Sequence, residues 1–252
     1  MTRIIIQGIN GRMGKALCEL IEQREDCRVV GGVDITSPSG AIPVAASLEE
    51  LNLPADVLID FSCPAATKSA LRFCAKNALP CVICTTGLDE EAEALIAEAS
   101  ACCAVFKSAN MSMGINLLAR LARQAAAALG LEYDIEIIEK HHHNKVDAPS
   151  GTALLLADEI NKAASEPYEY VYDRHAVRRK RSPHEIGLHA VRGGSIVGEH
   201  EILFCGPDEV ITLAHSAGSR RVFANGAVNA AVFLSRKGPG LYTMEDLMQE
   251  LL

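Results

Sequence analysis

The sequence lacks the long apolar runs of membrane-spanning helices, since none reaches the roughly 18–20 residues required. It also lacks an excess of positive charge: 24 Lys and Arg face 32 Asp and Glu, a net charge of -8. That balance favours solubility and argues against nonspecific binding to nucleic acid. Apolar residues make up 49% and charged residues 22% of the 252 residues. This composition predicts a globular protein with neither a membrane nor a nucleic acid as partner.

A signal peptide and a disulfide framework are both missing from the pattern. The chain runs from Met1 directly into the apolar segment Ile4–Ile6, without a leader-like stretch before it. The nine cysteines are an odd number and are scattered through apolar segments, which does not suit a set of structural disulfides. We therefore expect reduced, buried thiols and a cytoplasmic location.

The first half of the chain alternates short apolar runs with stretches that suit helices. Continuous apolar runs are typical of parallel strands whose sheet is covered by helices on both faces. The pattern predicts a doubly wound, Rossmann-type α/β domain over residues 1–112. The expected strands are Ile4–Ile6, Val29–Val33, Val57–Phe61, Cys81–Cys84 and Ala104–Phe106, and the expected helices are Met13–Arg24, Ala65–Asn77, Glu90–Ala101 and Met113–Leu129.

The pattern changes in residues 113–220. Polar and apolar residues alternate along Tyr133–Lys140, as expected for a half-exposed strand. The region therefore predicts a second, α+β domain with a mixed or antiparallel sheet. Residues 221–252 are expected to be helical again and to return to the first domain. The other expected elements are strands at Ile186–Arg192, Ile196–Cys205 and Val210–Ala217, and helices at Thr152–Ala163, Val222–Leu234 and Met244–Leu251.

A glycine-rich turn, Gly8–Gly14, lies between the first expected strand and helix. Its glycines allow a tight turn and a close approach of the backbone to a pyrophosphate, which the N–H groups of the next helix can bind. Arg12 adds a positive charge. The spacing is GxxGxxG rather than GxGxxG, so a plain strand-to-helix turn is the alternative.

The ends of the following strands favour a dinucleotide site. Asp34 ends the second strand 20 residues after Gly14, where a carboxylate can accept both ribose hydroxyls. Phe61–Ser62 and Thr85–Gly87 end two further strands at the same edge of the sheet. Ile35 follows Asp34 in place of an Arg or Lys that would bind a 2′-phosphate. We therefore predict that NADH is preferred and that NADPH is possible.

The densest group of reactive side chains lies in Glu139–Thr152, which contains three adjacent histidines, His141–His143, and Lys145. Adjacent residues of a strand point to opposite faces, whereas zinc ligands favour i,i+2 or i,i+4 spacing, so no metal is expected. Pro149–Thr152 has the features of a helix start, which can bind an anion. A proton donor, a cation and an anion site suit a carboxylate-bearing substrate; a solvated basic turn is the alternative.

Two further motifs do not require a function. Cys81 and Cys84 have redox-motif spacing, but they lie in an apolar strand, whereas the reactive thiol of such motifs needs a helix N-terminus. The basic run Arg178–Arg181 lacks the interleaved aromatic residues of a nucleic-acid site. It is interpreted either as a mobile loop that approaches a dicarboxylate or as a solvated face.

The chain resembles the 4-hydroxy-tetrahydrodipicolinate reductase (dihydrodipicolinate reductase) family from end to end. The matching segments are Gly8–Gly14, Cys84–Gly87, Glu139–Thr152, Val197–Glu201 and Phe223–Ala227. The resemblance implies NAD(P)H-dependent reduction of a cyclic, imine-type dicarboxylate to tetrahydrodipicolinate, in diaminopimelate and lysine biosynthesis. It also implies a cytoplasmic homotetramer that assembles through the second domain.

By position, the resemblance assigns proton donation to His141 and Lys145. It implies that the substrate carboxylate is bound by His142, Gly151 and Thr152. Together with the glycine-rich turn and the strand ends, it gives a set of cofactor-binding residues. These are Gly8, Gly11, Arg12, Met13, Gly14, Asp34, Phe61, Ser62, Thr85, Thr86, Gly87, Ala109, Asn110, Met111, Arg220 and Phe223. The chain departs from the family at Ile35 and Cys63, where relatives carry basic residues, and at Met111, which replaces an aromatic residue.

Two other functions are compatible with a dinucleotide site. The first is another two-domain NAD(P)-dependent dehydrogenase, such as one acting on a semialdehyde, for which Cys205 in a strand is a poor nucleophile. The second is a nicotinamide-sensing protein without turnover, which has no need of His141 and Lys145 beside an anion site.

Overall fold

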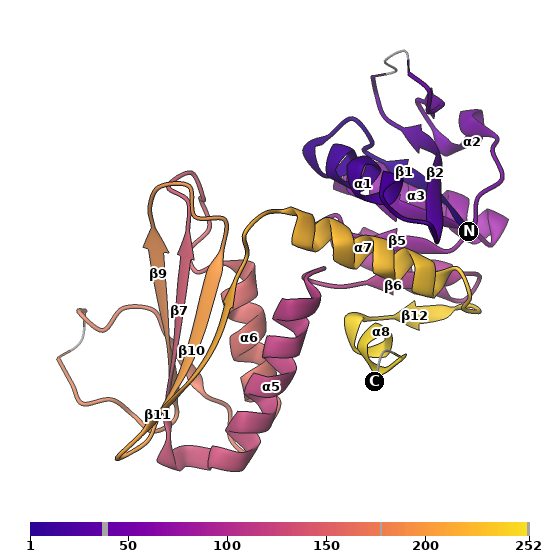
Figure 1. The fold of residues 1–252 in the computed structure, drawn as a ribbon. Helices are drawn as coiled ribbons and strands as arrows, with labels where there is room; N and C mark the ends of the chain where they lie inside the picture. Colours follow the sequence, from indigo (N-terminus) through magenta and orange to yellow (C-terminus); the bar gives the residue numbers. More distant parts are fainter. Residues whose placement is uncertain (37–39, 177, 251–252) are drawn as a thin grey trace. The chain divides into compact units, whose positions relative to one another are not determined.

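The structure, a computed structural model, describes residues 1–36, 40–176 and 178–250 (Figure 1). The chain forms two compact units: unit 1 comprises Met1–Met113 and Arg221–Leu252, and unit 2 comprises Gly114–Arg220. Within the described residues, no helix is long and apolar enough to cross a membrane.

Unit 1 is built on a parallel sheet of seven strands, in the order β12-β6-β5-β4-β1-β2-β3. All residues of β4 and β5 are buried, as a parallel sheet with two covered faces requires. The strands are β1 (Thr2–Gln7), β2 (Cys27–Val33), β3 (Val44–Ala45), β4 (Val57–Asp60), β5 (Cys81–Ile83), β6 (Ala104–Lys107) and β12 (Gly240–Tyr242). The helices are α1 (Arg12–Glu22), α2 (Leu48–Leu51), α3 (Pro64–Asn77), α4 (Glu90–Ser100), α7 (Arg221–Leu234) and α8 (Met244–Glu250).

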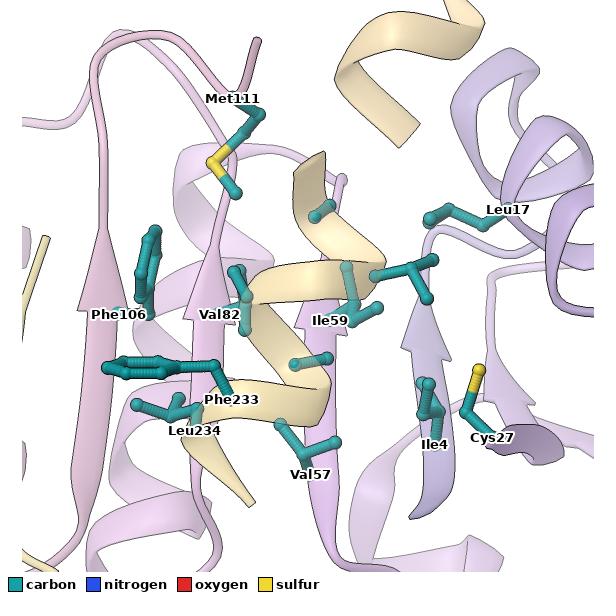
Figure 2. Close-up of a cluster of buried hydrophobic side chains, with 14 of the residues drawn as sticks. Ile4, Leu17, Cys27, Val57, Ile59, Val82, Phe106, Met111, Phe233 and Leu234 are labelled. Atoms are coloured by element: carbon teal, nitrogen blue, oxygen red, sulfur yellow. The ribbon is translucent and has the colours of Figure 1, made fainter. Parts of the chain in front are cut away.

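Two apolar clusters cover the faces of this sheet. On one face, Ile4 and Ile59 pack with Leu17 of α1 and with the alanine-rich side of α7 (Figure 2). On the other face, Ile5 packs in a cluster that includes residues of α3 and α4. Because successive strand residues point to opposite faces, neighbours such as Ile4 and Ile5 belong to different clusters. The sheet is therefore doubly wound, as the apolar runs predicted.

Helix α7 packs unusually close to the chain segment that follows β6. A Cβ atom on Gly226 would lie 1.7 Å from the carbonyl oxygen of Met111, so only glycine permits this contact. Met111 is itself 4% exposed and lies in the cluster shown in Figure 2. The close contact fixes the Ala109–Met111 segment at the carboxyl end of β6.

Unit 2 contains a mixed sheet of five strands, in the order β11-β10-β7-β9-β8. Strands β11, β10 and β7 are antiparallel neighbours, and β7, β9 and β8 are parallel neighbours. Helices α5 and α6 pack on one face through a common apolar cluster. The elements are α5 (Met113–Leu129), the 3₁₀ turn η1 (Gly130–Glu132), β7 (Asp134–His141), α6 (Gly151–Asn161), β8 (Glu169–Val171), β9 (Glu185–Arg192), β10 (Glu199–Cys205) and β11 (Val210–Ser216).

The predicted fold class is confirmed, and the predicted strands and helices are present with changed ends. Strand β10 begins at Glu199 rather than Ile196, and residues 196–198 are an irregular segment after a turn in which Gly194 has φ +52°. The short elements β3, α2, β8 and β12 were not predicted, since two to four residues carry no periodicity. The last predicted helix ends at Leu251, which lies outside the described residues, and α8 is described as far as Glu250.

Candidate active site

The glycine-rich turn of unit 1 needs its glycines for steric reasons. Gly8 has φ +79°, and a Cβ atom on it would lie 2.6 Å from the carbonyl oxygen of Phe61. A Cβ atom on Gly14 would lie 2.3 Å from the carbonyl oxygens of Gly8 and Ile9. Gly11 is the N-cap residue of α1, so no side chain caps the first N–H groups of this helix. The turn therefore fits a pyrophosphate-binding cradle.

Asp34 lies beside this turn as an ionised acceptor. It accepts N–H hydrogen bonds from Asn10 (3.0 Å) and Thr36 (3.2 Å). Burial opposes ionisation, but these donors outweigh it and lower the pKa of Asp34. Ile35, the next residue, is 96% exposed.

Asp34 borders a cavity of about 380 Å³. The cavity is lined by Gln7, Gly8, Val33, Asp34, Ile35, Ala46, Ser47, Leu48, Glu49, Ser62, Cys63, Ala66, Ser69 and Ala70.

A buried carboxylate that the sequence analysis missed organises the strand ends. Asp60, at the end of β4, accepts hydrogen bonds from the hydroxyls of Ser62, Thr67 and Thr85. Burial raises the pKa of Asp60 against the effect of these donors. Asp60 thus holds Ser62 and Thr85, two predicted cofactor-binding residues, at one edge of the sheet. Its position at the end of an apolar strand was the available indication.

The remaining predicted cofactor residues fall into three places. Arg12 and Met13 begin α1, and Thr86 and Gly87 follow β5, where Gly87 has φ +72°. In the segment after β6, Asn110 accepts the N–H of Ser112, and Met111 directs its side chain into the core. Met111 remains a predicted cofactor-binding residue, and because its side chain is buried, the predicted contact would be made by its backbone.

Two predicted cofactor residues come from the end of unit 2 and from the returning chain. Phe223 lies on α7 and is half-buried against the core of unit 1. Arg220 is exposed and is the last residue of unit 2.

In unit 2, the buried face of the sheet is apolar along most of β7 and becomes polar at the end of that strand. Along β7 the buried positions alternate, and the series that begins with Ile135 and Ile137 ends with Glu139 and His141. Cross-strand register places Arg192 of β9 opposite His141, and His200 of β10 opposite Glu139. Glu139, His141, Arg192 and His200 therefore gather at one end of the sheet; we call these four residues the polar cluster.

Glu139 is the centre of the polar cluster, with 0% exposure. It accepts two hydrogen bonds from the guanidinium of Arg192 (2.7 and 2.8 Å) and one from the backbone N–H of Ser150 (3.0 Å). Nδ1 of His141 lies 2.6 Å from its Oε2 atom. Burial opposes ionisation, but these donors outweigh it and lower the pKa of Glu139. The carboxylate is therefore charged and fully partnered.

His141 has one ring nitrogen committed and one available. Because ionised Glu139 can only accept, Nδ1 of His141 must carry a hydrogen and donate it. Nε2 is then the atom that gains or loses the exchangeable proton. A Cβ atom on Gly198 would lie 3.1 Å from Nε2, so glycine at this position keeps the space beside Nε2 open. The geometry suits a proton donor.

His200 completes the cluster as a neutral imidazole. It is 4% exposed, and its ring centroid lies 5.2 Å from that of His141. Burial, followed by the positive charge of His141, lowers the pKa of His200 to about 4. Its Nε2 lies 3.1 Å from the hydroxyl of Ser150, which also accepts the N–H of Ala153 and so caps α6.

Lys145 and His142 lie in the turn between β7 and α6. The ammonium of Lys145 is 3.0 Å from a carboxylate oxygen of Asp147. Burial opposes ionisation of Asp147, but Lys145 and backbone N–H groups, among them that of Gly151, together outweigh it and lower the pKa of that carboxyl. The backbone N–H of Lys145 donates to the carbonyl of His142 (3.1 Å). Gly151 and Thr152 begin α6 directly after this turn.

Several buried nitrogens around the polar cluster have no hydrogen-bond partner in the described part of the chain. They are Nδ1 of His142, Nε of Arg192, Nδ1 of His200 and Nδ1 of His215, the residue opposite His200. Buried polar atoms of this kind are rare, and each requires an explanation. Nε of Arg192 always carries a hydrogen and can donate it to an anion, whereas each imidazole nitrogen can donate only in the tautomer or protonation state that places a hydrogen on it. A fifth such atom, Nδ1 of His184, lies near Tyr168 instead.

The two motifs without a predicted function have structural roles. Arg181, the last residue of the basic run, is mostly buried and pairs with Asp134 and Glu136, so it is not a solvated cation. Cys81 is buried in β5, and burial raises the pKa of Cys84 well above its usual value. Nine free cysteines are present, but Cys63 and Cys102 are exposed, contrary to the expectation of buried thiols.

Unit 1 has a Rossmann-type parallel sheet and unit 2 has a mixed sheet, and solved structures share this fold. A probable dehydrogenase from Thermotoga maritima has this fold, with 12% identity and a TM-score of 0.64 over 99% of this chain and 93% of that one. At such low identity the likeness concerns the fold alone.

Sequence comparison specifies the family. Residues 2–111 match the family described as "Dihydrodipicolinate reductase, N-terminus", and residues 114–248 match "Dihydrodipicolinate reductase, C-terminus". The 4-hydroxy-tetrahydrodipicolinate reductase of Caldanaerobacter subterraneus subsp. tengcongensis is 51% identical over 99% of both chains. A dipicolinate-bound dihydrodipicolinate reductase from Paenisporosarcina sp. TG-14 is 27% identical, with a TM-score of 0.78 over 96% of this chain and 97% of that one. The chain belongs to the dihydrodipicolinate reductase family.

The protonation state of His200 can be measured directly. An ordinary histidine titrates near 6.5, whereas burial and the positive charges of His141 and Lys145 outweigh Glu139 and keep His200 neutral. We expect the ¹⁵N shifts of its ring in the intact protein to remain those of neutral imidazole down to about pH 5. The variant His200→Gln identifies the resonance. Half-protonation of His200 near pH 6.5 would contradict the described environment.

Proposed function

We propose that this chain catalyses the NAD(P)H-dependent reduction of 4-hydroxy-tetrahydrodipicolinate to tetrahydrodipicolinate in diaminopimelate and lysine biosynthesis. The names of its relatives support the substrate. The observation that carries the chemistry is His141, held by buried Glu139 through Nδ1 beside nitrogens that suit an anion.

The reaction requires a hydride, a proton and a site for two carboxylates. Loss of water from the 4-hydroxy compound leaves a ring with conjugated C=C and C=N bonds. Addition of a hydride to this system delivers two electrons, and a proton must be added to balance the charge. A reduced nicotinamide, when bound, supplies the hydride. The protein therefore has to bind the dinucleotide and the dicarboxylate and to deliver the proton.

Unit 1 provides the dinucleotide site. The turn Gly8–Gly14 would bind the pyrophosphate, as its steric requirement for glycine supports. Asp34 would accept from the adenosine ribose. The residues held by Asp60, together with Phe61, Thr86, Gly87 and the Ala109–Met111 segment, would line the rest of the site. Arg220 and Phe223 complete the proposed set.

Unit 2 provides the proton and the anion site. His141 would donate from Nε2, and Lys145 would assist by stabilising negative charge as it develops. His142 would bind a substrate carboxylate, which its unpartnered Nδ1 supports. Gly151 and Thr152, at the start of α6, would direct backbone N–H groups to the same carboxylate.

The cysteines support a location, and the sheet of unit 2 supports an assembly. Nine free cysteines support a cytoplasmic protein.

The sheet of unit 2 carries α5 and α6 on one face, and alternate residues of β7 and β10 remain half-buried on the other. A second copy of the chain would cover that face, and we propose a homotetramer formed through unit 2.

The proposed reaction is tested by following NADH absorbance with the precursor generated by the preceding synthase reaction. We expect NADH oxidation, and we expect His141→Gln and Lys145→Ala each to lower kcat by about 10²–10⁴-fold, the typical contribution of a positioned acid. His143→Gln, in the exposed part of the turn, serves as the control. Absence of NADH oxidation would exclude this substrate and favour another dehydrogenase or a sensing protein. A few-fold loss in both variants would overturn the proton-donor assignment.

We propose that NADH is the preferred cofactor and that NADPH is also accepted. Asp34 is ionised and Ile35 offers no charge to a 2′-phosphate. Two like charges 4 Å apart in water repel by about 1 kcal/mol, or roughly fivefold in affinity. We expect kcat/KM for NADH to exceed that for NADPH by about fivefold or more, and Ile35→Arg to narrow the ratio. A strong preference of the unmodified protein for NADPH would contradict the proposal.

A further inference from the structure

We infer that Glu139 and Arg192 are positioning residues for His141 and that they have opposite effects on how readily it releases its proton. Glu139 orients the imidazole and favours its protonated form, and Arg192 offsets part of the carboxylate charge so that the proton can leave. This inference rests on the proposed function, in which His141 is the proton donor. It adds two residues that the sequence analysis did not assign.

The strand itself places Glu139 against His141. The two residues are i and i+2 on β7 and share its buried face, as the twofold period of a strand requires. The 2.6 Å contact between Nδ1 and Oε2 fixes the ring plane. It also fixes the tautomer, which leaves Nε2 beside Gly198 for the exchangeable proton.

Arg192 is placed to counter the same carboxylate. It lies opposite His141 in the β7–β9 register and contacts both oxygens of Glu139, at 2.8 and 2.7 Å. One of its terminal nitrogens also donates to the carbonyl of Asp147 (2.6 Å). Ser150 fills the remaining acceptor position of Glu139 through its backbone N–H. The carboxylate is therefore held from the strand β9 and from the start of α6 at once.

The charge arrangement gives the two residues opposite effects. A lone carboxylate in this setting would stabilise the cationic form of His141 and so hold the proton. The cation of Arg192 reduces that attraction. A proton donor is most effective when it is both protonated and able to release its proton at the working pH. The ring of neutral His200 from β10 lies 5.2 Å from that of His141. His215 of β11 lies opposite His200, and the cation Lys145 of the turn acts on His200 as well.

The experiment compares pH profiles of kcat and kcat/KM in variants of the full-length protein. In Glu139→Gln, the loss of activity at high pH should move to lower pH by about 1 or more. At neutral pH, kcat should fall at least tenfold, with KM for the substrate changed less than about threefold. In Arg192→Gln, the loss of activity at high pH, which we call the alkaline limb of the profile, should move to higher pH. In Arg192→Lys, which keeps the positive charge, the alkaline limb should lie close to that of the unmodified protein.

A matched control and a second variant separate this role from a structural one. Glu159→Gln removes a carboxylate of α6 that pairs with Lys162. It lies outside the polar cluster and outside the sheet face proposed for assembly, and the substitution should leave the profile unchanged. The double variant Glu139→Gln/Arg192→Gln leaves no unpaired buried charge, and keeps the comparison possible if Glu139→Gln does not fold. Its alkaline limb should lie between those of the two single variants.

The ¹⁵N shifts of the His141 ring, followed against pH in the same variants, test the inference without turnover. Opposite displacements of its titration in Glu139→Gln and Arg192→Gln support the inference. Displacements in the same direction, or a fall in kcat with no displacement, would overturn it and assign both residues a structural role only. Failure of the unmodified protein to oxidise NADH would instead refute the proposed function, and the ring titration would still decide the inference.

Discussion

The polar cluster of unit 2 depends on one buried carboxylate. An ion of this kind costs several kcal/mol to remove from water unless its partners are well placed. Glu139 meets this requirement with partners from three elements: His141 of β7, Arg192 of β9 and Ser150 at the start of α6. The hydrogen bonds that stabilise the buried carboxylate also fix the positions of these three partners. The geometry of the polar cluster therefore follows from the stabilisation of one buried charge.

Close contact of backbone with backbone plays the comparable part in unit 1. Gly8 allows the turn after β1 to contact the chain after β4, and Gly14 allows α1 to contact that turn. Gly226 allows α7 to contact the carbonyl of Met111. Asp60 joins the strand ends through hydroxyl donors. Unit 1 thus supports a dinucleotide site by shape, whereas unit 2 supports an anion and proton site by charge.

Periodicity and local motifs predicted the elements, the glycine turn and the His141–Thr152 segment, because each of these is encoded within a few adjacent residues. The contact of Glu139 with Arg192, and the position of His200 in the polar cluster, were not predicted. Arg192 and His200 are more than 50 residues away in the chain, and their position depends on cross-strand register, which the hydrophobic pattern of a single strand does not specify. Asp60 was missed because its three donors come from different parts of the chain: Ser62 after β4, Thr67 in α3 and Thr85 after β5.

The central claim is that His142, Gly151 and Thr152 bind a dicarboxylate while Glu139 of the polar cluster holds His141. A crystal structure of the protein with dipicolinate tests it most directly. The account predicts carboxylate oxygens within hydrogen-bond distance of His142 and of the backbone N–H groups of Gly151 and Thr152, with Nδ1 of His141 still on Glu139. Dipicolinate bound away from these residues, or His141 turned away from Glu139, would contradict the account.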